Sequence, residues 1–230
     1  RNGKDYRRFS EHVGKIPLVL IAPSDSFLVS GGSDERRKFM DVVISQYDSL
    51  YLEHVIRYEK TLKQRNALLK SEAEPDASVM DVLEDMMAQS ASVVYARRKA
   101  FVVAFVTIFR DIYARLCNSD TETVDIVYES HGARGALKEL LAAGRPKERI
   151  VGHTLHGVHK DELQLYFNGY PVKREGSQGQ TKTYFIAMKL AQYVFLQRKG
   201  ERKTPILLLD DIFDKLDAGR VSKIIEYVLE

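Results

Sequence analysis

The most constraining feature of this 230-residue sequence is a short apolar run that ends in two acidic residues. Ile206 to Leu209 are consecutive aliphatic residues that follow Pro205, and Asp210 and Asp211 come directly after them. An uninterrupted aliphatic run of this length predicts a short strand that is buried on both faces, as in a parallel sheet. Because ligands bind at the carboxyl ends of strands in open α/β sheets, we expect both carboxylates at such an edge.

This pattern is typical of a Walker B strand. There the first acid holds Mg²⁺ on a nucleoside triphosphate, and the second polarises the attacking water. We therefore assign Asp210 to the metal and Asp211 to catalysis. The alternative is a hydrophobic strand that ends in a solvated acidic turn, and the Asp-Asp pair alone does not decide between the two.

A small polar loop upstream favours the nucleotide interpretation. It reads Gly176-Ser177-Gln178-Gly179-Gln180 and precedes a helical pattern that runs from Thr181 to about Arg198. Ser177 is a good N-cap residue, and a helix N-terminus approached by small residues is a suitable site for an anion. Loop, helix and acidic strand together therefore predict a phosphate-binding arrangement.

With the following Asp214-Lys215-Leu216-Asp217, these segments resemble the signature helix, Walker B strand and D-loop of the ATP-binding-cassette (ABC) ATPases. The Ser-Gln-Gly-Gln form, combined with Asp-Asp, is similar to the RecF family, bacterial DNA-repair relatives of the SMC proteins. Further blocks resemble that family in its own order: Asn2-Gly3-Lys4, Ala22-Pro23-Ser24-Asp25, Glu35 to Asp41, Tyr58-Glu59, Gln64 to Lys70, and Thr154 to Asp161. The departures are modest: Ser33 and Val158 stand where that family favours proline, and Lys160 stands where it favours arginine.

The resemblance implies a mixed α/β fold, namely part of a P-loop NTPase lobe of the ABC type with an inserted antiparallel helical arm. Residues 1–32 would belong to the ATPase lobe, residues 33–120 would form the arm (lobe II), and residues 121–230 would complete the lobe. Ser177, Gln178, Gly179 and Gln180 would bind, in trans, the γ-phosphate of ATP held by a partner protomer. Asp217 would lie in the D-loop, at the interface between the two protomers.

The same resemblance implies ATP and Mg²⁺ as cofactors and a homodimer that forms with ATP. It also implies double-stranded or gapped DNA and RecO- and RecR-like proteins as partners, in a cytoplasmic protein that loads recombinase. An architectural clamp of the SMC type is the alternative, but a helical pair of this size is short for an SMC coiled coil. A transporter cassette is disfavoured by the helical insert.

One expected motif is missing from the sequence. No Gly-x-x-x-x-Gly-Lys-Ser/Thr loop occurs in the 230 residues, and in the RecF family that loop lies N-terminal to the region that resembles this chain. We therefore interpret the chain as a segment that carries the back half of an ATPase site together with the arm.

Two long helical patterns predict the arm itself. Apolar and seam positions from Tyr51 to Leu69 step by four and three, and a second set from Val79 to Ile112 keeps this spacing almost to Cys117. The second helix would run about 40 residues, or roughly 60 Å, so the two should lie antiparallel. The spacing places Arg97 on the seam, where it needs an acidic partner or a route to solvent.

Shorter patterns predict the remaining elements. We expect strands over 16–22 and 124–128, a helix capped by Ser33 or Asp34, a helix over 133–143 closed by Gly144 before Pro146, and a hairpin at Asn168-Gly169 after the alternating Leu163, Leu165 and Phe167.

Charge and polar clusters add weaker signals. A formal net charge of +3 permits a nucleic-acid partner. Arg36, Arg37 and Lys38 are candidates for DNA contact, and the alternative is a solvated helix face. His153, His156 and His159 suggest a metal site by their spacing, but neighbouring glycines argue against a helix and no cysteine cluster supports zinc. The lone Cys117 excludes an internal disulfide and fits a reducing compartment.

Overall fold

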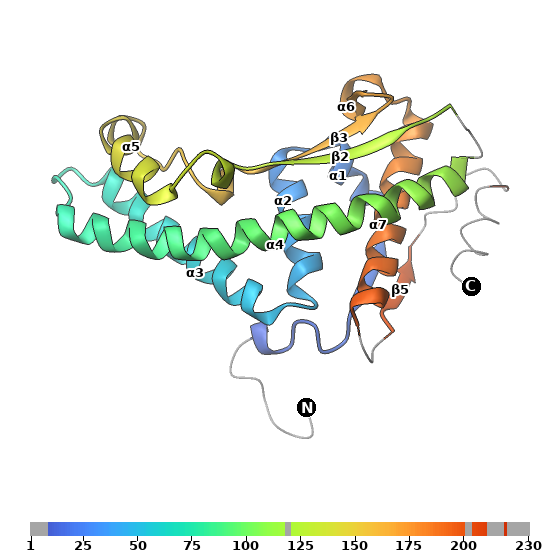
Figure 1. Ribbon diagram of the computed structural model, residues 1–230, viewed down its shortest axis with the longest axis horizontal. Helices are drawn as coiled ribbons and strands as arrows, with labels where there is room; N and C mark the ends of the chain where they lie inside the picture. The colour runs from blue at the N-terminus through green and yellow to red at the C-terminus, as the bar shows by residue number, and fades with distance from the viewer. Residues whose placement is uncertain (1–8, 118–120, 201–203, 211–218, 220–230) are drawn as a thin grey trace.

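The computed structural model describes residues 9–117, 121–200, 204–210 and 219. Figure 1 shows an elongated arrangement in which the long helix α4 (Ala77–Cys117) follows the long axis. One end of the molecule carries both sheets and the helix α7 (Gln178–Lys199), and the other end carries the helical arm. The expected mixed α/β fold is confirmed.

The remaining elements have the following bounds. The other helices are α1 (Phe27–Ser30), α2 (Ser33–Ser45), α3 (Ser49–Lys70), α5 (Leu137–Val151) and α6 (Val172–Glu175). Strands β1 (Leu18–Ile21) and β5 (Ile206–Leu209) form a parallel pair, and β2 (Val124–Glu129), β3 (Glu162–Phe167) and β4 (Tyr170–Pro171) form an antiparallel sheet in that order. Short 3₁₀ turns are η1 (Phe9–Glu11), η2 (Pro23–Ser26), η3 (His131–Ala133) and η4 (Val158–Lys160).

The helices α3 and α4 lie side by side and form the arm (Figure 1). At the start of α3, the carboxylate of Asp48 accepts a hydrogen bond from the amide of Tyr51 at 2.9 Å, which satisfies one of the helix's unpaired amides. Only residues 71–76 separate α3 from α4, so the two helices run antiparallel. The prediction of two long paired helices is confirmed. No helix within the described ranges has both the length and the apolar character that a membrane span requires.

The buried face of α4 repeats every eleven residues, not every seven. Met80, Ala91, Val102 and Tyr113 form one buried row, and Leu83, Val94, Phe105 and Leu116 form the next. Eleven residues in three turns correspond to about 3.67 residues per turn, which is close to the period of a straight α-helix. Positions spaced by about 3.5 residues per turn instead move gradually around such a helix and leave its buried face. The seam predicted from the sequence is therefore wrong in part, beginning with its first position, because Val79 is 46% exposed.

The arginines of α4 also differ from the prediction, by one position along the helix. Arg98 is buried in the middle of α4, whereas the side chain of Arg97 is 50% exposed and pairs with Asp48 at 2.9 Å. The predicted position of Arg97 on the buried seam is wrong, although it does have an acidic partner. The buried arginine of this helix is Arg98.

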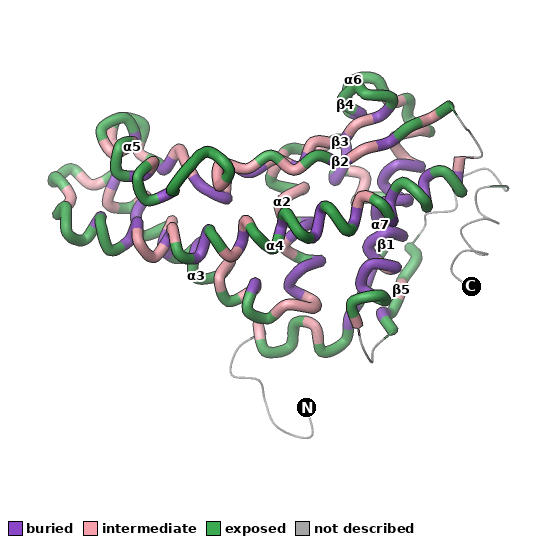
Figure 2. Tube along the Cα trace, viewed as in Figure 1, coloured by how far each residue is buried: buried purple, intermediate pink, exposed green. Residues whose placement is uncertain are grey.

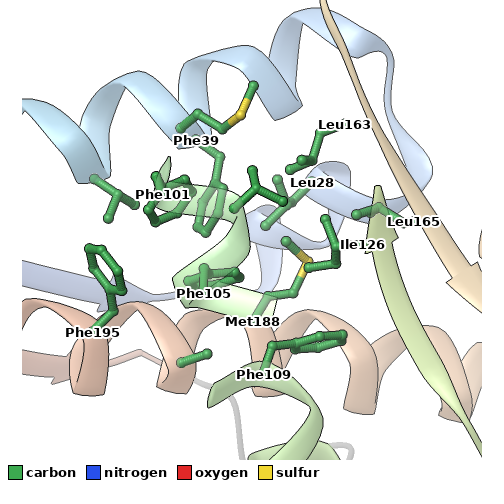
Figure 3. Packing of buried hydrophobic residues seen from close by; sticks show 14 of the residues in the cluster. Leu28, Phe39, Phe101, Phe105, Phe109, Ile126, Leu163, Leu165, Met188 and Phe195 are labelled. Carbon is green, nitrogen blue, oxygen red and sulfur yellow. The ribbon is translucent and has the colours of Figure 1, made fainter. Parts of the chain in front are cut away.

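The hydrophobic core lies where α2, α4, α7 and the β2–β3 sheet meet, as Figure 2 shows by burial. Phe101 of α4 packs against Phe195 of α7 and Phe105 of α4, with 5.0 Å between ring centroids in each pair (Figure 3). Phe39 of α2 contacts the same rings. Aromatic contacts therefore fix α7 against the arm helix α4.

Arg98 is the centre of a buried polar network. Its Nη1 donates to the carbonyl of Val158 at 2.8 Å and forms an ion pair with Asp161 Oδ2 at 2.9 Å, and its Nη2 pairs with Asp41 Oδ1 at 2.9 Å. Tyr51 of α3 lies 3.1 Å from Arg98 Nε. The guanidinium thus joins three helices to the segment that leads into β3.

A second network surrounds Arg65 nearer the tip of the arm. Arg65 Nη2 lies 2.9 Å from Glu84 and 2.7 Å from Glu148, and all three side chains are 0% exposed. Arg65 Nη1 donates to the hydroxyl of Thr154 at 2.8 Å. Since a buried charge is tolerated only when it is paired and hydrogen-bonded, this network ties α3, α4 and α5 together at fixed positions.

The helix α5 differs from the prediction at both ends. It begins at Leu137 and continues through Gly144 and Pro146 to Val151, so the predicted helix over 133–143 closed by Gly144 is wrong. Pro146 removes one backbone hydrogen bond, but residues after it have tertiary partners. Arg149 Nη1, for example, donates to the carbonyl of Leu68 at 2.9 Å. The helix ends at Val151, and Gly152 follows it as the C-cap with a φ of 71°, which is typical of glycine.

The predicted cap of α2 is also wrong. Gly32 occupies the N-cap position and Ser33 begins the helix, and no side chain caps it. The carboxylate of Asp34 instead pairs with Arg37 one turn further along.

The expected hairpin and strands are confirmed. β2 pairs with β3 along its whole length, and β3 turns into β4 at Asn168 and Gly169, whose φ angles are 48° and 81°. Two successive residues with positive φ match the tight hairpin turn that Asn-Gly favours. The predicted strand over 16–22 is present as the shorter β1.

Candidate nucleotide site

The acidic strand β5 is present where the sequence predicts it. It pairs in parallel with β1, with Leu209 opposite Ile21, and the amide of Asp210 donates to the carbonyl of Ile21 at 2.9 Å. The backbone bond fixes Asp210 at the carboxyl end of the pair, where its side chain is exposed. Asp211 and Asp217, the other two predicted acids, lie outside the described residues.

The expected burial of β5 on both faces is wrong for the described part of the chain. Ile206 and Leu208 are each 46% exposed and Leu209 is 37% exposed. The reason is geometric, because β5 pairs only with β1 among the described residues and so forms one edge of a two-stranded sheet. The aliphatic pattern identifies the strand correctly but not its surroundings.

The loop before α7 has the geometry of a capping box. The hydroxyl of Ser177 accepts a hydrogen bond from the amide of Gln180 at 3.2 Å, and the side-chain oxygen of Gln180 accepts one from the amide of Ser177 at 2.9 Å. Ser177, Gln178 and Gly179 are exposed. The predicted cap is confirmed, and the positive end of a long helix faces solvent, where an anion can approach it.

A close packing requirement explains the glycine before this cap. A Cβ atom at Gly176 would lie 2.8 Å from the carbonyl oxygen of Val172 and 3.0 Å from the hydroxyl of Thr181. A larger residue would therefore push the loop away from α6 and change the entry into α7.

The two described parts of the candidate site, Asp210 and the Ser177 loop, lie apart from each other in this chain. Asp25, which follows β1, pairs with Lys189 of α7 at 3.4 Å, so the carboxyl end of β1 lies level with Lys189. Lys189 is twelve residues from Ser177 along α7, which corresponds to about 18 Å at 1.5 Å per residue. Asp210, hydrogen-bonded beside the end of β1, is accordingly remote from the Ser177 loop.

The basic triplet on α2 is largely engaged inside the fold. Arg36 Nε pairs with Glu162 Oε1 at 2.8 Å, and Arg37 Nη1 donates to the carbonyl of Asp161 at 2.6 Å. The side chains of Arg36 and Arg37 are each 14% exposed, whereas Lys38 is exposed. A role in DNA contact remains a prediction for all three residues.

No profile of a known protein family matches the chain, but curated proteins match nearly all of it. The DNA replication and repair protein RecF of Phocaeicola vulgatus is 53% identical over 228 residues, which cover 99% of this chain and 61% of that protein. RecF of Parabacteroides distasonis is 50% identical over 230 residues, which cover 100% and 62%. This chain belongs to the RecF family. It spans about three fifths of the length of these relatives.

A solved RecF structure has the same fold. The structure of the recombination mediator protein RecF-ATP in the RecFOR pathway matches with a TM-score of 0.88 and 26% identity, over 98% of this chain and 62% of that one. The RecF resemblance inferred from the motifs is thus confirmed, and the comparisons favour it over the SMC-type alternative.

Two acidic residues of this RecF-family chain contact the elements that carry the candidate site, and no sequence pattern singles them out for that role. Glu122 accepts a hydrogen bond from the side-chain amide of Gln180 at 3.0 Å. Asp25 accepts one from the amide of Ala22 at 2.9 Å and pairs with Lys189, whose pKa is lowered by burial. Glu122 lies in an irregular segment and Asp25 in the short 3₁₀ turn η2, so no periodicity marks them, although Asp25 falls in a block that resembles RecF.

In this RecF-family chain His153, His156 and His159 lie in the segment between α5 and β3. His159 Nδ1 lies 2.7 Å from the hydroxyl of Tyr58, and burial lowers the pKa of His159 to about 4. His153 is exposed, and the ring of His156 lies against His131 instead. Within the described ranges, no three potential ligands of the His, Cys, Asp or Glu type gather to hold a metal.

A large cavity lies away from the candidate nucleotide site. It measures about 920 Å³ between α2, α3 and the segment before β1, and it contains neither Asp210 nor Ser177. Tyr58, His159 and Arg98 form part of its lining. Size alone therefore does not locate the candidate site in this RecF-family chain.

Proposed function

We propose that this RecF-family chain supplies half of each of two composite ATP sites in a dimer. The observation that carries the proposal is the separation of the two site halves along α7. If Asp210 held Mg²⁺ on a bound triphosphate, Ser177 of the same chain would lie too far away to contact that triphosphate, because about 18 Å of helix separates the levels of Lys189 and Ser177. The exposed, capped N-terminus of α7 is then available to the nucleotide of a second protomer.

Individual residues have distinct roles in this proposal. Asp210 would hold Mg²⁺, since an exposed carboxylate at a strand end is the ligand type that this ion prefers, and Asp211 would orient the attacking water. Ser177, Gln178, Gly179 and Gln180 would contact the γ-phosphate across the interface. Asp217 would lie in the D-loop between the two protomers. Mg²⁺, when bound, neutralises charge that develops on the phosphates.

The biological role follows from the family. We propose that the whole protein is an ATP-dependent dimer that acts in the cytoplasm on double-stranded DNA near gaps and works with RecO- and RecR-like proteins to load recombinase. The supporting observations are the names of the relatives and the RecFOR context given for the solved RecF-ATP structure. Residues 33–120 would act as the arm, and residues 1–32 and 121–230 would belong to the ATPase lobe.

The test uses a full-length RecF-family protein that contains this chain. Ser177→Arg places a bulky side chain at the proposed junction, so the variant should bind ATP as a monomer but fail to dimerise with ATP and lose hydrolysis. Ser177→Ala is the matched comparison, because it removes the cap, at a cost of about 1 kcal/mol in stability, and one proposed phosphate contact, but adds no bulk at the junction. It should therefore weaken the ATP-induced dimer less than Ser177→Arg does. Light scattering with and without ATP separates the two, and an intact ATP-induced dimer in the arginine variant would refute the assignment.

A further inference from the structure

Glu122 lies between the arm helix α4 and the loop proposed to contact nucleotide in trans. Its Oε1 accepts a hydrogen bond from Nε2 of Gln180 at 3.0 Å, and its Oε2 accepts one from the hydroxyl of Tyr113 at 3.0 Å. A carboxylate accepts hydrogen bonds and donates none, so both neighbours must turn a donor toward it. Glu122 thereby determines which way the amide of Gln180 points.

That orientation decides whether the capping box can form. With Nε2 of Gln180 directed at Glu122, the other amide atom, Oε1, accepts from the backbone N–H of Ser177 at 2.9 Å. A flipped amide would bring its NH₂ group against that N–H, and two donors would face each other. Without an acceptor at position 122, Nε2 of Gln180 loses the partner that favours the productive orientation. Glu122 therefore holds the Ser177 loop in its capped form.

The other partner of Glu122 is firmly placed in the core. Tyr113 is 1% exposed, and its ring contacts Tyr184 of α7 at 6.0 Å and Phe167 of β3 at 6.5 Å between centroids. Burial raises the pKa of Tyr113, so its hydroxyl keeps its proton and remains a donor. Tyr113 lies in the last turns of α4, a helix of 41 residues. The hydrogen bonds thus connect the end of the arm helix to the loop.

We infer that Glu122 is a positioning residue that sets the Ser177–Gln180 loop according to the position of α4, so that the arm and the loop move together. This inference rests on the proposed function, because the loop matters for ATP only if it acts across a dimer. Glu122 is not one of the residues proposed to contact the nucleotide. It acts through Gln180 and, in turn, through Ser177.

The experiment measures ATP-dependent dimerisation of the full-length protein and, separately, binding of ATP to its monomer. Glu122→Ala should weaken dimerisation about three- to tenfold, as expected for the net loss of one hydrogen bond, and leave monomer binding of ATP unchanged. Tyr113→Phe keeps the ring packing and removes the donor, so it should produce a smaller loss in the same direction. Glu122→Gln retains one acceptor oxygen and should restore part of the dimerisation lost in Glu122→Ala.

Glu129→Ala provides the matched control, because Glu129 is an exposed acid at the far end of β2. An effect of Glu129→Ala equal to that of Glu122→Ala would overturn the inference. So would a Glu122→Ala protein with a lower melting temperature but normal dimerisation at 25 °C, since that is the signature of a purely structural contact. Ser177→Arg, measured in parallel, distinguishes failure of the positioning role from failure of the proposed function. If Ser177→Arg dimerises normally, the proposed function itself fails; if only Glu122→Ala is silent, the positioning role alone fails.

Discussion

Arg98 of α4 and Asp161, which precedes β3, form a buried ion pair with 2.9 Å between Nη1 and Oδ2. Asp161 is 0% exposed, and its other oxygen accepts a hydrogen bond from the hydroxyl of Ser130 at 2.6 Å. The hydroxyl of Tyr128 also donates to Asp161. Both carboxylate oxygens are therefore occupied, and the pair fixes the arm helix relative to the β2–β3 sheet.

Removing the arginine of this pair should be strongly destabilising. Arg98→Met keeps most of the side-chain length but leaves Asp161 buried without its cation, and we expect a loss of about 3–5 kcal/mol in the free energy of unfolding. Arg97→Met is the matched control at the adjacent position, because the half-exposed pair of Arg97 with Asp48 should contribute less than about 1 kcal/mol. Denaturant unfolding of both variants tests this, and equal losses would contradict the buried assignment.

His159 should make stability depend on pH below neutrality. Its pKa is about 4 in the folded protein, against an ordinary value of 6.5, because burial disfavours the charged ring. Between these values the unfolded chain binds a proton that the folded chain does not. Stability should therefore fall as the pH drops from 6.5 toward 4, with a slope of up to about 1.4 kcal/mol per pH unit.

The measurement for His159 is urea unfolding at several pH values between 7.5 and 5. His159→Gln keeps a polar side chain but removes the titration, so the variant should lose less stability on acidification than the wild type. His153→Gln, at an exposed histidine six residues earlier, should leave the pH dependence as it is. If His159→Gln retained the full pH dependence, another group would be responsible for it.

Gly157 should not tolerate a side chain, because it lies against the hydrogen bond between Tyr58 and His159. Its φ is 136°, and a Cβ atom there would lie 2.1 Å from the Tyr58 hydroxyl and 3.1 Å from Nδ1 of His159. Gly157→Ala should therefore strain the backbone and break the Tyr58–His159 hydrogen bond, with an expected loss of about 1–3 kcal/mol. Gly32→Ala is a suitable steric control, since no atom beyond the neighbouring residues lies within 4 Å of a Cβ at that position. Thermal unfolding should show a clear decrease for the first variant and a small change for the second.

The local patterns of the sequence predict the elements well and their surroundings poorly. Ser177 is identifiable as a cap because capping depends only on a few neighbouring residues, and the Asn168-Gly169 hairpin is identifiable for the same reason. The buried position of Arg98 is not, because a one-residue difference in phase depends on which helices pack against α4 at each level. Pro146 is locally a stop signal, but long-range contacts such as Glu148 with Arg65 keep the helix going beyond it.

The candidate site is predictable only in part. Asp210 and the Ser177 loop stand in recognisable motifs, so the sequence locates both. Glu122 lies in a short irregular segment, and its importance arises from contacts with Tyr113 and with Gln180, which is distant in sequence. The burial of β5 depends on the rest of the sheet, which is a tertiary property that an aliphatic run cannot specify.

The 230-residue chain by itself should neither bind ATP tightly nor hydrolyse it. Its sequence contains no Gly-x-x-x-x-Gly-Lys-Ser/Thr loop, and Asp210 with a capped helix cannot replace the amides and the lysine that hold the phosphates. A phosphate-release assay on the purified chain, with and without Mg²⁺, should give only background turnover. Mg²⁺-dependent turnover that Asp210→Ala abolishes would overturn this expectation.

DNA binding by this chain, if it uses the basic triplet, should depend mainly on Lys38. The side chain of Lys38 is exposed, whereas Arg36 is held by Glu162 at 2.8 Å and by the carbonyl of Gly31 at 3.1 Å. A lysine that contacts a phosphate releases about one counterion, so Lys38→Ala should weaken binding equally for all sequences and reduce the salt slope by about one. Arg36→Ala should instead lower stability by about 1 kcal/mol.

Fluorescence anisotropy with labelled duplex DNA at several salt concentrations measures both the affinity for DNA and its dependence on salt. Because the net charge is only +3, affinity should be weak, and because the contacts are mainly electrostatic it should fall as salt is added. An affinity that stayed constant up to several hundred millimolar salt would show that the contacts are not electrostatic. If Lys38→Ala changed neither the affinity nor the salt slope, the triplet would have a structural role and would not contact DNA. The ion pairs of Arg36 with Glu162 and of Arg37 with Asp34 already engage two of its three charges within the fold.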